Sequence, residues 1–525
     1  MTGAEHLARS AQFTLTDAAS GFSIDFGGMN FSAEELQAMA PRFARAAEGI
    51  AAIEAGAIKN PDEKRRVTHF TDRVAYPETP LFAEVEDFAR KVISGEITGS
   101  AGRRFEAVAL NGIGGSALGP QLMQFALNGP YWNEKSAAAR GNALKIYFLD
   151  NTDSAEFADL AEVMDPETTL HLVVSKSGGT RETANNMTAM ENFYRARGLD
   201  FARHAVAVTM PGSKLDRHAR EANWLAVFAM AESIGGRTSE TSIVGHVPAA
   251  LTGVDFRSFL AGACAMDEWT RAADPQKNPA MMLAAMWFIA GNGRGDRNMV
   301  IVPYSDRLVL LSRYLQQLVM ESLGKELDLD GATVHQGLSV FGNKGGTDAH
   351  AFIQQLNDGR DDFFATFIEV LRDREKIPLD NGIGMGDYLH GFLAGLTDAL
   401  LGKGRQVISI RVPELSAFTL GQLIALYERT VAIYAEFIHI NAFHQPGVQA
   451  YKLAAKGVLA LREKLFGALK TAPAQDKTAA EIASAAGLSE ADAVTVGDLL
   501  DKAALNGGAT RRFDTARNMW VYSTK

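Results

Sequence analysis

The chain has 525 residues, and its composition excludes several classes of protein at once. A hydrophobic fraction of 47% is typical of a globular protein, while a formal net charge of −10 argues against general binding to nucleic acid or anionic membranes, which requires a basic surface. A chain of this length exceeds one ordinary hydrophobic core, so two or more packed units are expected.

The start of the chain and its apolar runs indicate a cytoplasmic protein. The first residues lack the basic segment and apolar core of a signal peptide. No uncharged apolar run reaches the roughly 18 residues of a membrane span. The single cysteine, Cys264, lies in the apolar string Leu260 to Met266 and is expected to be a buried, inert thiol.

Residues 1–100 are expected to form a mainly helical segment that packs on the core. Ser32 and Glu35 fit a capping box, in which two side chains satisfy backbone N–H groups at the start of a helix. Pro41 is expected to interrupt the helix that follows, because proline lacks the N–H that an inner helical position donates.

Strand-like and helix-like stretches alternate over residues 101–250. This alternation is typical of a parallel sheet built by right-handed crossovers. The first predicted helix runs to Leu127, and helical stretches separate four predicted strands: Ala107 to Leu110, Lys145 to Leu149, Thr169 to Val174 and Ala205 to Thr209.

A second α/β unit is expected over residues 251–469. Helices dominate its first part, where Met281, Met282, Met286 and Trp287 are interpreted as core packing. The predicted fold class is therefore α/β, with two parallel sheets flanked by helices. In this second unit the alternation resumes with three predicted strands: Met299 to Pro303, Phe363 to Val370 and Gln406 to Val412.

Residues 470–525 form an appendage with a different pattern. An alanine-rich linker around Pro473 leads into a helix, a turn at Gly487 and a second helix, which resemble a helix-turn-helix, and RNMWVYS indicates a strand. Acidic and basic residues nearly cancel here, so packing or an oligomer contact is favoured over DNA binding.

Two turns that follow predicted strands are candidate phosphate sites. A strand that opens onto a helix presents unpaired backbone N–H groups and the positive end of the helix dipole, which favour an anion. Hydroxyls and an ammonium suit one phosphate monoester. The alternative is that these residues are ordinary N-caps of two helices. The first turn holds Gly115 and Ser116, and the second holds Ser175, Lys176, Ser177 and Thr180.

The first turn also matches a dinucleotide-binding fingerprint at Gly112, Gly114 and Ala117, and Asp150 closes the next strand as a ribose-binding carboxylate would. Asp150 nevertheless lies nearly forty residues beyond Gly112 instead of about twenty. The fingerprint also leaves the hydroxyl-rich second turn unexplained. A nicotinamide-dependent dehydrogenase is therefore the second hypothesis.

Several side chains further along are candidates for chemistry. Gln317 and Glu321 lie four residues apart in a predicted helix, so they share one face, and a carboxylate removed from water becomes a usable base. His350 follows two glycines near a helix start and can relay protons near pH 7. Arg237 also follows two glycines and can face developing negative charge, and Lys452 lies on a helix after a Pro-Gly turn.

Each of these residues also has a structural interpretation. A lone helical glutamate is usually solvated, a histidine is as often a core residue, an arginine commonly forms a structural ion pair, and lysines are usually at the surface. No group of residues has the spacing of a metal site, since His335 and His350 lie apart and there is no cysteine pair or His-Glu-x-x-His motif. Metal-free chemistry is expected.

Six motifs occur in order across residues 100–460: NGIGGSALGP, SKSGGT, GGRTSETSIVG, MESLGKE, GGTDAHAF and FHQPGVQAYK. Together they resemble the phosphoglucose isomerase family of the bacterial type. The resemblance implies two sugar-isomerase domains, each a parallel sheet flanked by helices. It also implies a cofactor-independent reaction of glycolysis and gluconeogenesis, the reversible conversion of glucose 6-phosphate to fructose 6-phosphate through ring opening and an enediolate.

The resemblance further implies roles for matching residues. Glu321 would move a proton between C2 and C1, His350 with Lys452 would open the sugar ring, and Arg237 would stabilise the enediolate. Gln317 and Gln445 would position the substrate. The phosphate would be bound by Gly115, Ser116, Ser175, Lys176, Ser177 and Thr180.

In this family the histidine reaches the site from a neighbouring subunit, so the resemblance implies a homodimer with shared active sites. A third hypothesis is a non-catalytic sugar-phosphate sensor that uses the helix-turn-helix as its output. The joint presence of Glu321, His350 and Lys452 weighs against such a sensor.

Overall fold

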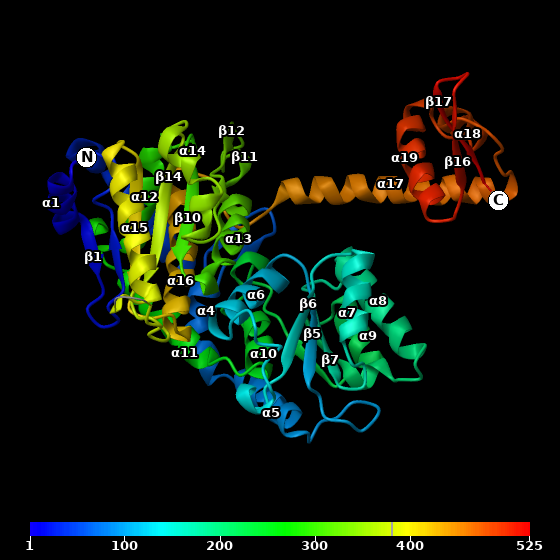
Figure 1. The fold of residues 1–525 in the computed structure, drawn as a ribbon, viewed down its shortest axis with the longest axis horizontal. Helices are drawn as coiled ribbons and strands as arrows, with labels where there is room; N and C mark the ends of the chain where they lie inside the picture. The colour runs from blue at the N-terminus through cyan, green and yellow to red at the C-terminus, as the bar shows by residue number, and fades with distance from the viewer. Residues whose placement is uncertain (380–381, 525) are drawn as a thin grey trace. The chain divides into compact units, whose positions relative to one another are not determined.

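The computed structural model describes residues 1–379 and 382–524, and the chain forms two compact units, Met1–His444 and Gln445–Lys525 (Figure 1). The first unit contains two sheets and their helices. The domain boundaries expected from the sequence stay a prediction. The observed division groups helix α17 (Pro446–Thr471) with the appendage.

The first sheet has five strands, all paired in parallel, in the order β6-β5-β7-β8-β9. Every residue of β5, β7 and β8 is buried, because helices cover both faces of the sheet. The four strands expected here are confirmed, and the short β9 was not predicted. The strands are β5 (Ala107–Asn111), β6 (Lys145–Leu149), β7 (Thr169–Val174), β8 (Ala205–Thr209) and β9 (Ala226–Ala229).

Alternate residues of these strands face two different cores. Val108 and Leu172 pack with helices α5 (Pro80–Ser94) and α10 (Ile243–Leu251), whereas Ala109 and Val173 pack with the helices on the other face. Helix α6 follows β5 directly, and α8 follows β7. Between and after the strands lie α6 (Gly115–Leu127), α7 (Ser154–Val163), α8 (Arg181–Arg195) and α9 (Lys214–Glu221).

The second sheet has six strands in the order β1-β2-β15-β14-β10-β13. Its central strands pair in parallel and confirm the three strands expected in the second α/β unit. A predicted fold of parallel sheets flanked by helices is thus confirmed. The strands are β10 (Asn298–Tyr304), β13 (Val340–Phe341), β14 (Phe363–Val370), β15 (Gln406–Val412), β1 (Thr14–Thr16) and β2 (Ser23–Asp25).

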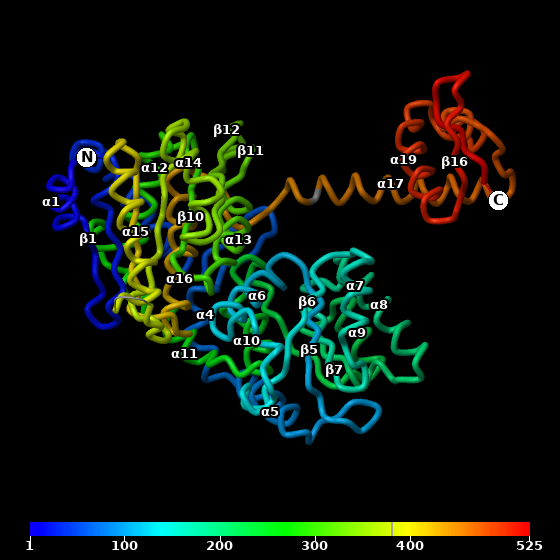
Figure 2. The backbone as a smooth tube through the Cα atoms, viewed as in Figure 1, coloured from blue at the N-terminus to red at the C-terminus, as the bar shows by residue number. Residues whose placement is uncertain are grey.

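The N-terminal segment supplies the antiparallel edge of this second sheet. β2 pairs with β15 so that Asp25 lies opposite Ser409, and Figure 2 shows the first residues running beside this sheet. The sequence did not predict these two short strands. The capping box at Ser32 and Glu35 is confirmed, and the helix breaks at Met39, so that Pro41 lies in the first turn of the next helix. The helices of this segment are α1 (Gly3–Phe13), α2 (Ala33–Ala38), α3 (Ala40–Glu54) and α4 (His69–Ala75).

Helices cover both faces of the second sheet as well. On one face Val300 and Phe367 pack with α14 (Ile353–Asp358) and α15 (Met385–Gly402). The other face packs on a large core built by α11 (Phe256–Trp269), α12 (Pro279–Ala290) and α16 (Ala417–Phe437). The residues Met281, Met282, Met286 and Trp287 lie in that core, as predicted.

The second unit has its own small core. Tyr522 pairs with Lys477 in an isolated bridge, and Leu465 and Leu469 of α17 pack against Ile482 and Leu500. The predicted helix-turn-helix and the final strand are confirmed. After α17 the unit contains α18 (Ala479–Ala485), α19 (Ala493–Leu505) and the antiparallel pair β16 (Thr510–Asp514) and β17 (Met519–Ser523).

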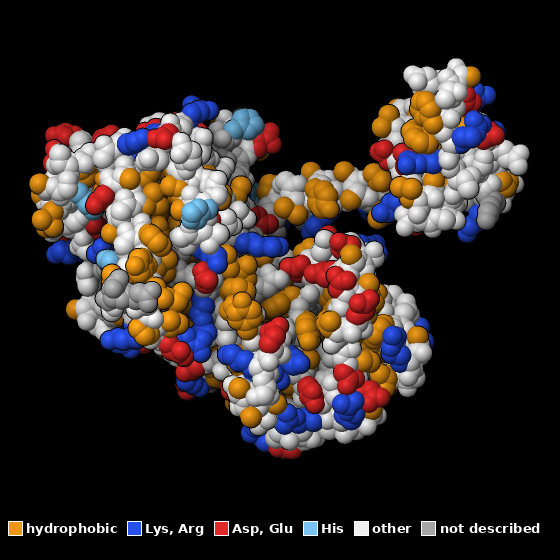
Figure 3. Space-filling model, viewed as in Figure 1, with side chains coloured by type: hydrophobic (Ala, Val, Ile, Leu, Met, Phe, Trp, Pro, Cys, Tyr) orange, Lys and Arg blue, Asp and Glu red, His pale blue; other side chains and the backbone are white. Residues whose placement is uncertain are grey.

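The surface carries both signs of charge. On the face drawn in Figure 3, basic and acidic side chains are interspersed on each unit. Exposed residues of α19 include Val494, Asp498, Lys502 and Leu505, which do not form a basic face. Within the described residues, no helix combines the length and apolarity needed to cross a bilayer.

Cys264 differs from its prediction. The thiol is half-buried instead of buried, and this partial burial raises its pKa, which disfavours the reactive thiolate.

Candidate active site

The turn after β7 is held in a fixed conformation by its own hydroxyls. The Ser175 Oγ accepts a hydrogen bond from the Gly178 backbone N–H at 3.1 Å, and the Ser177 Oγ accepts one from Gly179 at 3.1 Å. Gly178 has a φ of +64°, and a Cβ there would lie 2.3 Å from the backbone nitrogen of Leu215. Only glycine therefore fits this position.

Lys176 joins this turn to the segment that precedes Arg237. Its ammonium donates to the carbonyl oxygens of Glu232 at 2.6 Å and Ile234 at 2.8 Å. Burial, assisted by the charge of Arg65, lowers the pKa of Lys176 to about 8. The two carbonyl groups thus hold the ammonium next to the turn.

Neither helix that follows these turns is capped by a hydroxyl side chain of the turn. Gly114 is the N-cap of α6, so Ser116 lies inside the first helical turn. Thr180 is the N-cap of α8, but its side chain makes no capping hydrogen bond. The hydroxyl groups of Ser116 and Thr180 therefore do not serve as side-chain caps of these helices.

The glycines of the first turn allow two other segments to approach closely. A Cβ at Gly115 would lie 1.8 Å from the carbonyl oxygen of Gly236, and one at Gly114 would lie 3.0 Å from Nε2 of Gln317. The turn is consequently in contact with the residues on either side of Arg237 and with the helix that carries Glu321.

Arg237, Gln317 and Glu321 meet at this place. Arg237 is only 6% exposed, and its Nε donates to Oε2 of Glu321 at 3.0 Å. The same oxygen accepts a hydrogen bond from Gln317 Nε2 at 3.3 Å. Burial lowers the pKa of Arg237, and the Glu321 carboxylate opposes that effect. The Glu321 side chain is 23% exposed, so a ligand can reach it.

Glu321 lies in a π-helix, where the sequence predicted a regular helix. α13 (Leu311–Leu315) is followed by the π-helical segment Gln316–Glu321, labelled η7. Side chains four residues apart still share a face in this wider turn, which is why the Gln317 to Glu321 contact forms. Such segments are rare and frequently occur at functional sites.

His350 is not brought to this cluster within one chain. It lies in the 3-10 turn Thr347–His350, where a regular helix start was expected, and it is exposed. No hydrogen bond or ion pair between the described side chains joins it to Glu321. The buried Asp348 holds the turn by accepting hydrogen bonds from Asn343.

Gln445 and Lys452 belong to the second compact unit. Gln445 is the N-cap residue of α17, and Lys452 is exposed on that helix. Their contacts with a substrate stay predictions.

The site contains functional candidates that the sequence analysis missed. Tyr314 contacts the carbonyl oxygen of Arg237 at 3.5 Å and donates to the buried Glu240, and Arg65 donates to the carbonyl oxygen of Ser233 at 3.3 Å. Lys325 lies behind Glu321. Glu240 and Lys325 occur inside two of the six motifs, so membership of a motif was the available signal, whereas Arg65 lies in none of them.

No group of three or more His, Cys, Asp or Glu side chains within the described part of the chain has the geometry to hold a metal ion. The carboxylate of Asp150, considered for a ribose, accepts a hydrogen bond from Gln121 of α6 at 2.7 Å. The cluster itself brings one carboxylate and one guanidinium beside the first glycine turn.

Comparisons with known proteins show which proteins resemble this chain in sequence and in fold. The glucose-6-phosphate isomerase of Geobacter sulfurreducens is 46% identical over 510 residues, which cover 94% of each chain. That of Gloeothece citriformis is 47% identical over 465 residues, 86% of each chain. The crystal structure of a glucose-6-phosphate isomerase from Chlamydia trachomatis has a TM-score of 0.76 at 27% identity and covers 86% of this chain and 91% of that one.

The family model described as phosphoglucose isomerase matches residues 50–407 and 400–465, which leaves the appendage, residues 470–525, outside the match. All six motifs lie within the residues that the family model matches, and the relatives are 46% and 47% identical to the chain. The chain belongs to the phosphoglucose isomerase family.

Proposed function

We propose that the chain interconverts glucose 6-phosphate and fructose 6-phosphate, the reaction named by its relatives. The observation that carries this proposal is the contact of 3.0 Å between the Glu321 carboxylate and the Arg237 guanidinium beside the first glycine turn. A buried cation beside a reachable carboxylate is what proton transfer next to a developing oxyanion requires.

Each group has a distinct part in the proposed reaction. After ring opening, Glu321 removes the proton from C2 of the aldose and returns it to C1. The proton of the C2 hydroxyl passes to the oxygen on C1, so the carbonyl group moves from C1 to C2. Arg237 stabilises the negative oxygen of the enediolate between these steps. The hydroxyls and Lys176 of the two turns bind the phosphate, so that binding energy at the far end of the sugar holds the reacting carbons in place.

The replacement of Glu321 by Gln tests the base. The amide keeps an oxygen for Arg237 and Gln317 but cannot accept the proton, so the exchange of C2 hydrogen in heavy water should fall by roughly 10²- to 10⁴-fold. Sugar phosphate should still bind. Glu326→Gln, at the exposed carboxylate five residues on, is the control and should retain full exchange. Normal exchange in Glu321→Gln would remove this residue from its role.

A homodimer that shares His350 between subunits is also proposed. His350 is exposed, and no hydrogen bond or ion pair among the described residues joins it to Glu321, which agrees with a role in a neighbouring site. Mixing the inactive variants Glu321→Gln and His350→Ala tests it. If the histidine comes from the partner, each mixed dimer has one intact site, and up to about a quarter of the wild-type activity returns. If both residues act within one chain, the mixture stays inactive.

The other expectations stay predictions. A cytoplasmic location, the absence of a cofactor and the assistance of Lys452 in ring opening rest on the resemblance and on the composition of the chain. A titration with NADH distinguishes the dehydrogenase hypothesis from the proposed isomerase, because only a dehydrogenase is expected to bind NADH saturably. The sensor hypothesis predicts tight binding of sugar phosphate without conversion.

A further inference from the structure

Lys325 is a buried cation directly behind the proposed base. It is 5% exposed and begins strand β11 (Lys325–Leu327), four residues after Glu321. Its Nζ donates to the backbone carbonyl oxygen of Glu321 at 2.7 Å and to that of Ser322 at 2.8 Å. Among the described contacts, no carboxylate forms an ion pair with this ammonium.

The position is costly for a lysine. Burial, assisted by the charge of Arg237, lowers the pKa of Lys325 to about 7, and only Glu321 opposes these effects. An apolar side chain would avoid the desolvation of an ammonium. A stabilising role in the core alone therefore does not explain why a lysine stands here.

The two carbonyl groups explain what the ammonium does. The last carbonyl groups of a helix lack partners inside it, and a lysine near the end can satisfy them. Here they belong to the final residue of the π-helix, Glu321, and to the residue after it. Because these carbonyl groups have no partners inside the helix, regular backbone hydrogen bonds fix the backbone of Glu321, and so the direction of its side chain, less firmly than in the middle of a helix.

Glu321 is consequently held from two sides. Lys325 holds its backbone, while Gln317 and Arg237 hold one oxygen of its carboxylate. A single base that serves two adjacent carbons needs its carboxylate fixed within about half an ångström, which requires supporting contacts of this kind. We propose that Lys325 is a positioning residue, whose ammonium fixes the end of the π-helix and with it the direction of the Glu321 side chain. This inference rests on the proposed role of Glu321.

Substitution of Lys325 separates positioning from binding. In Lys325→Met the side chain keeps its length but loses its donors, so kcat should fall by about 10- to 100-fold, as a misplaced catalytic group does. KM should stay within about threefold, because the phosphate turns are untouched. Lys325→Arg keeps donors and should recover most of the lost kcat. Lys403→Met, at the half-exposed lysine that follows the last residue of α15, is the control.

Binding of 6-phosphogluconate, a sugar phosphate that cannot isomerise, reports whether the folded site survives. The inference is overturned if Lys325→Met has wild-type kcat. It is also overturned if the activity falls because KM rises and the affinity for 6-phosphogluconate decreases. If Lys325→Met does not fold, Lys325→Gln, which keeps one donor group, is measured instead. Its kcat should be about tenfold lower than that of Lys325→Arg. An equal kcat of these two variants overturns the inference.

Measurement of Glu321→Gln in parallel distinguishes a failure of the role proposed for Lys325 from a failure of the role proposed for Glu321. If Glu321→Gln is inactive while Lys325→Met is fully active, only the role of Lys325 fails. If Glu321→Gln is active, the proposed base itself is wrong.

Discussion

Lys176 shows how the surroundings of one residue change its chemistry. The sequence shows an ordinary lysine in a polar turn, but in the fold its half-buried ammonium donates to the carbonyl groups of Glu232 and Ile234. Burial lowers the pKa of Lys176 to about 8. The charged form therefore predominates below pH 8 and is lost as the pH rises through that value.

A pH dependence of binding follows from this. Above pH 8 the neutral amine attracts the phosphate less, so kcat/KM for glucose 6-phosphate should fall, since this ratio reports groups of the free enzyme. In Lys176→Arg the guanidinium stays charged, and the fall should begin at higher pH. Lys214→Arg, at an exposed lysine on α9, should leave the profile unchanged. An identical profile in Lys176→Arg would exclude Lys176 as the source.

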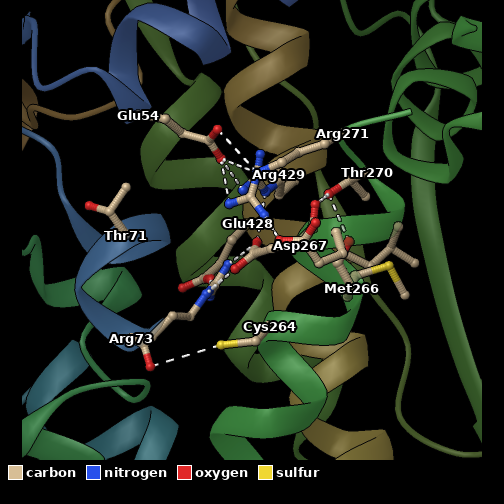
Figure 4. A network of polar contacts seen from close by, with 12 residues as sticks. Glu54, Thr71, Arg73, Cys264, Met266, Asp267, Thr270, Arg271, Glu428 and Arg429 are labelled. Atoms are coloured by element: carbon tan, nitrogen blue, oxygen red, sulfur yellow. Dashed lines mark hydrogen bonds and ion pairs between the residues drawn. The ribbon is translucent and has the colours of Figure 1, made fainter. Parts of the chain in front are cut away.

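At the scale of elements, a buried network of charges joins the helices behind the second sheet (Figure 4). Arg73 of α4 donates to both oxygens of Asp267 of α11, at 2.7 and 2.5 Å, and pairs with Glu428 of α16. Arg429 donates to Asp267 at 2.7 Å and pairs with Glu54 of α3. Four helices distant in sequence thus share one network, and Arg73, Asp267 and Glu428 have no exposed side-chain surface.

Breaking this network should destabilise the first unit strongly. Asp267→Asn leaves Arg73 and Arg429 without their shared carboxylate, and loss of one partner of a buried pair typically costs about 3–5 kcal/mol. Urea denaturation should show this decrease in the free energy of unfolding. Glu78→Gln removes an exposed ion pair with Arg257 and should change stability by less than about 1 kcal/mol. Equal effects of the two substitutions would contradict the argument.

At the scale of the whole molecule, the appendage is separable from the family fold. The family match ends at residue 465, and the helix-turn-helix with its hairpin has a core of its own. The exposed residues of α19 mix apolar and charged side chains, which agrees with the expectation of a contact surface and not of DNA binding. Nothing in the proposed reaction requires residues 472–525.

A chain that ends at Thr471 should therefore retain kcat and KM. Leu465 and Leu469 would lose the core that they pack against, so both are replaced by Gln in this variant. A chain that ends at His444 also lacks Lys452 and should lose activity, if that lysine assists ring opening. Rates of fructose 6-phosphate conversion decide between these outcomes. Loss of activity in the longer variant would give the appendage a functional role.

The sequence by itself determined the central strands, the two turns and the pairing of Gln317 with Glu321. Strands such as β7 and β8 are buried on both faces, so they occur as continuous apolar runs between turn residues, and their bounds could be predicted. The turns were predictable because glycine and hydroxyl residues follow those runs directly. Gln317 and Glu321 were paired correctly because their spacing is nearly the same in a regular helix and a π-helix.

Only the tertiary structure decided the rest. Strands β1 and β2 have three residues each, too few for a periodic signal, and they are strands because β15 offers an edge. The π-helix Gln316–Glu321 could not be predicted from the sequence, because it differs from a regular helix in its backbone hydrogen bonds and not in its pattern of side chains. Lys325 and Lys176 are ordinary lysines until packing removes water from them, and packing depends on segments that lie far away along the chain.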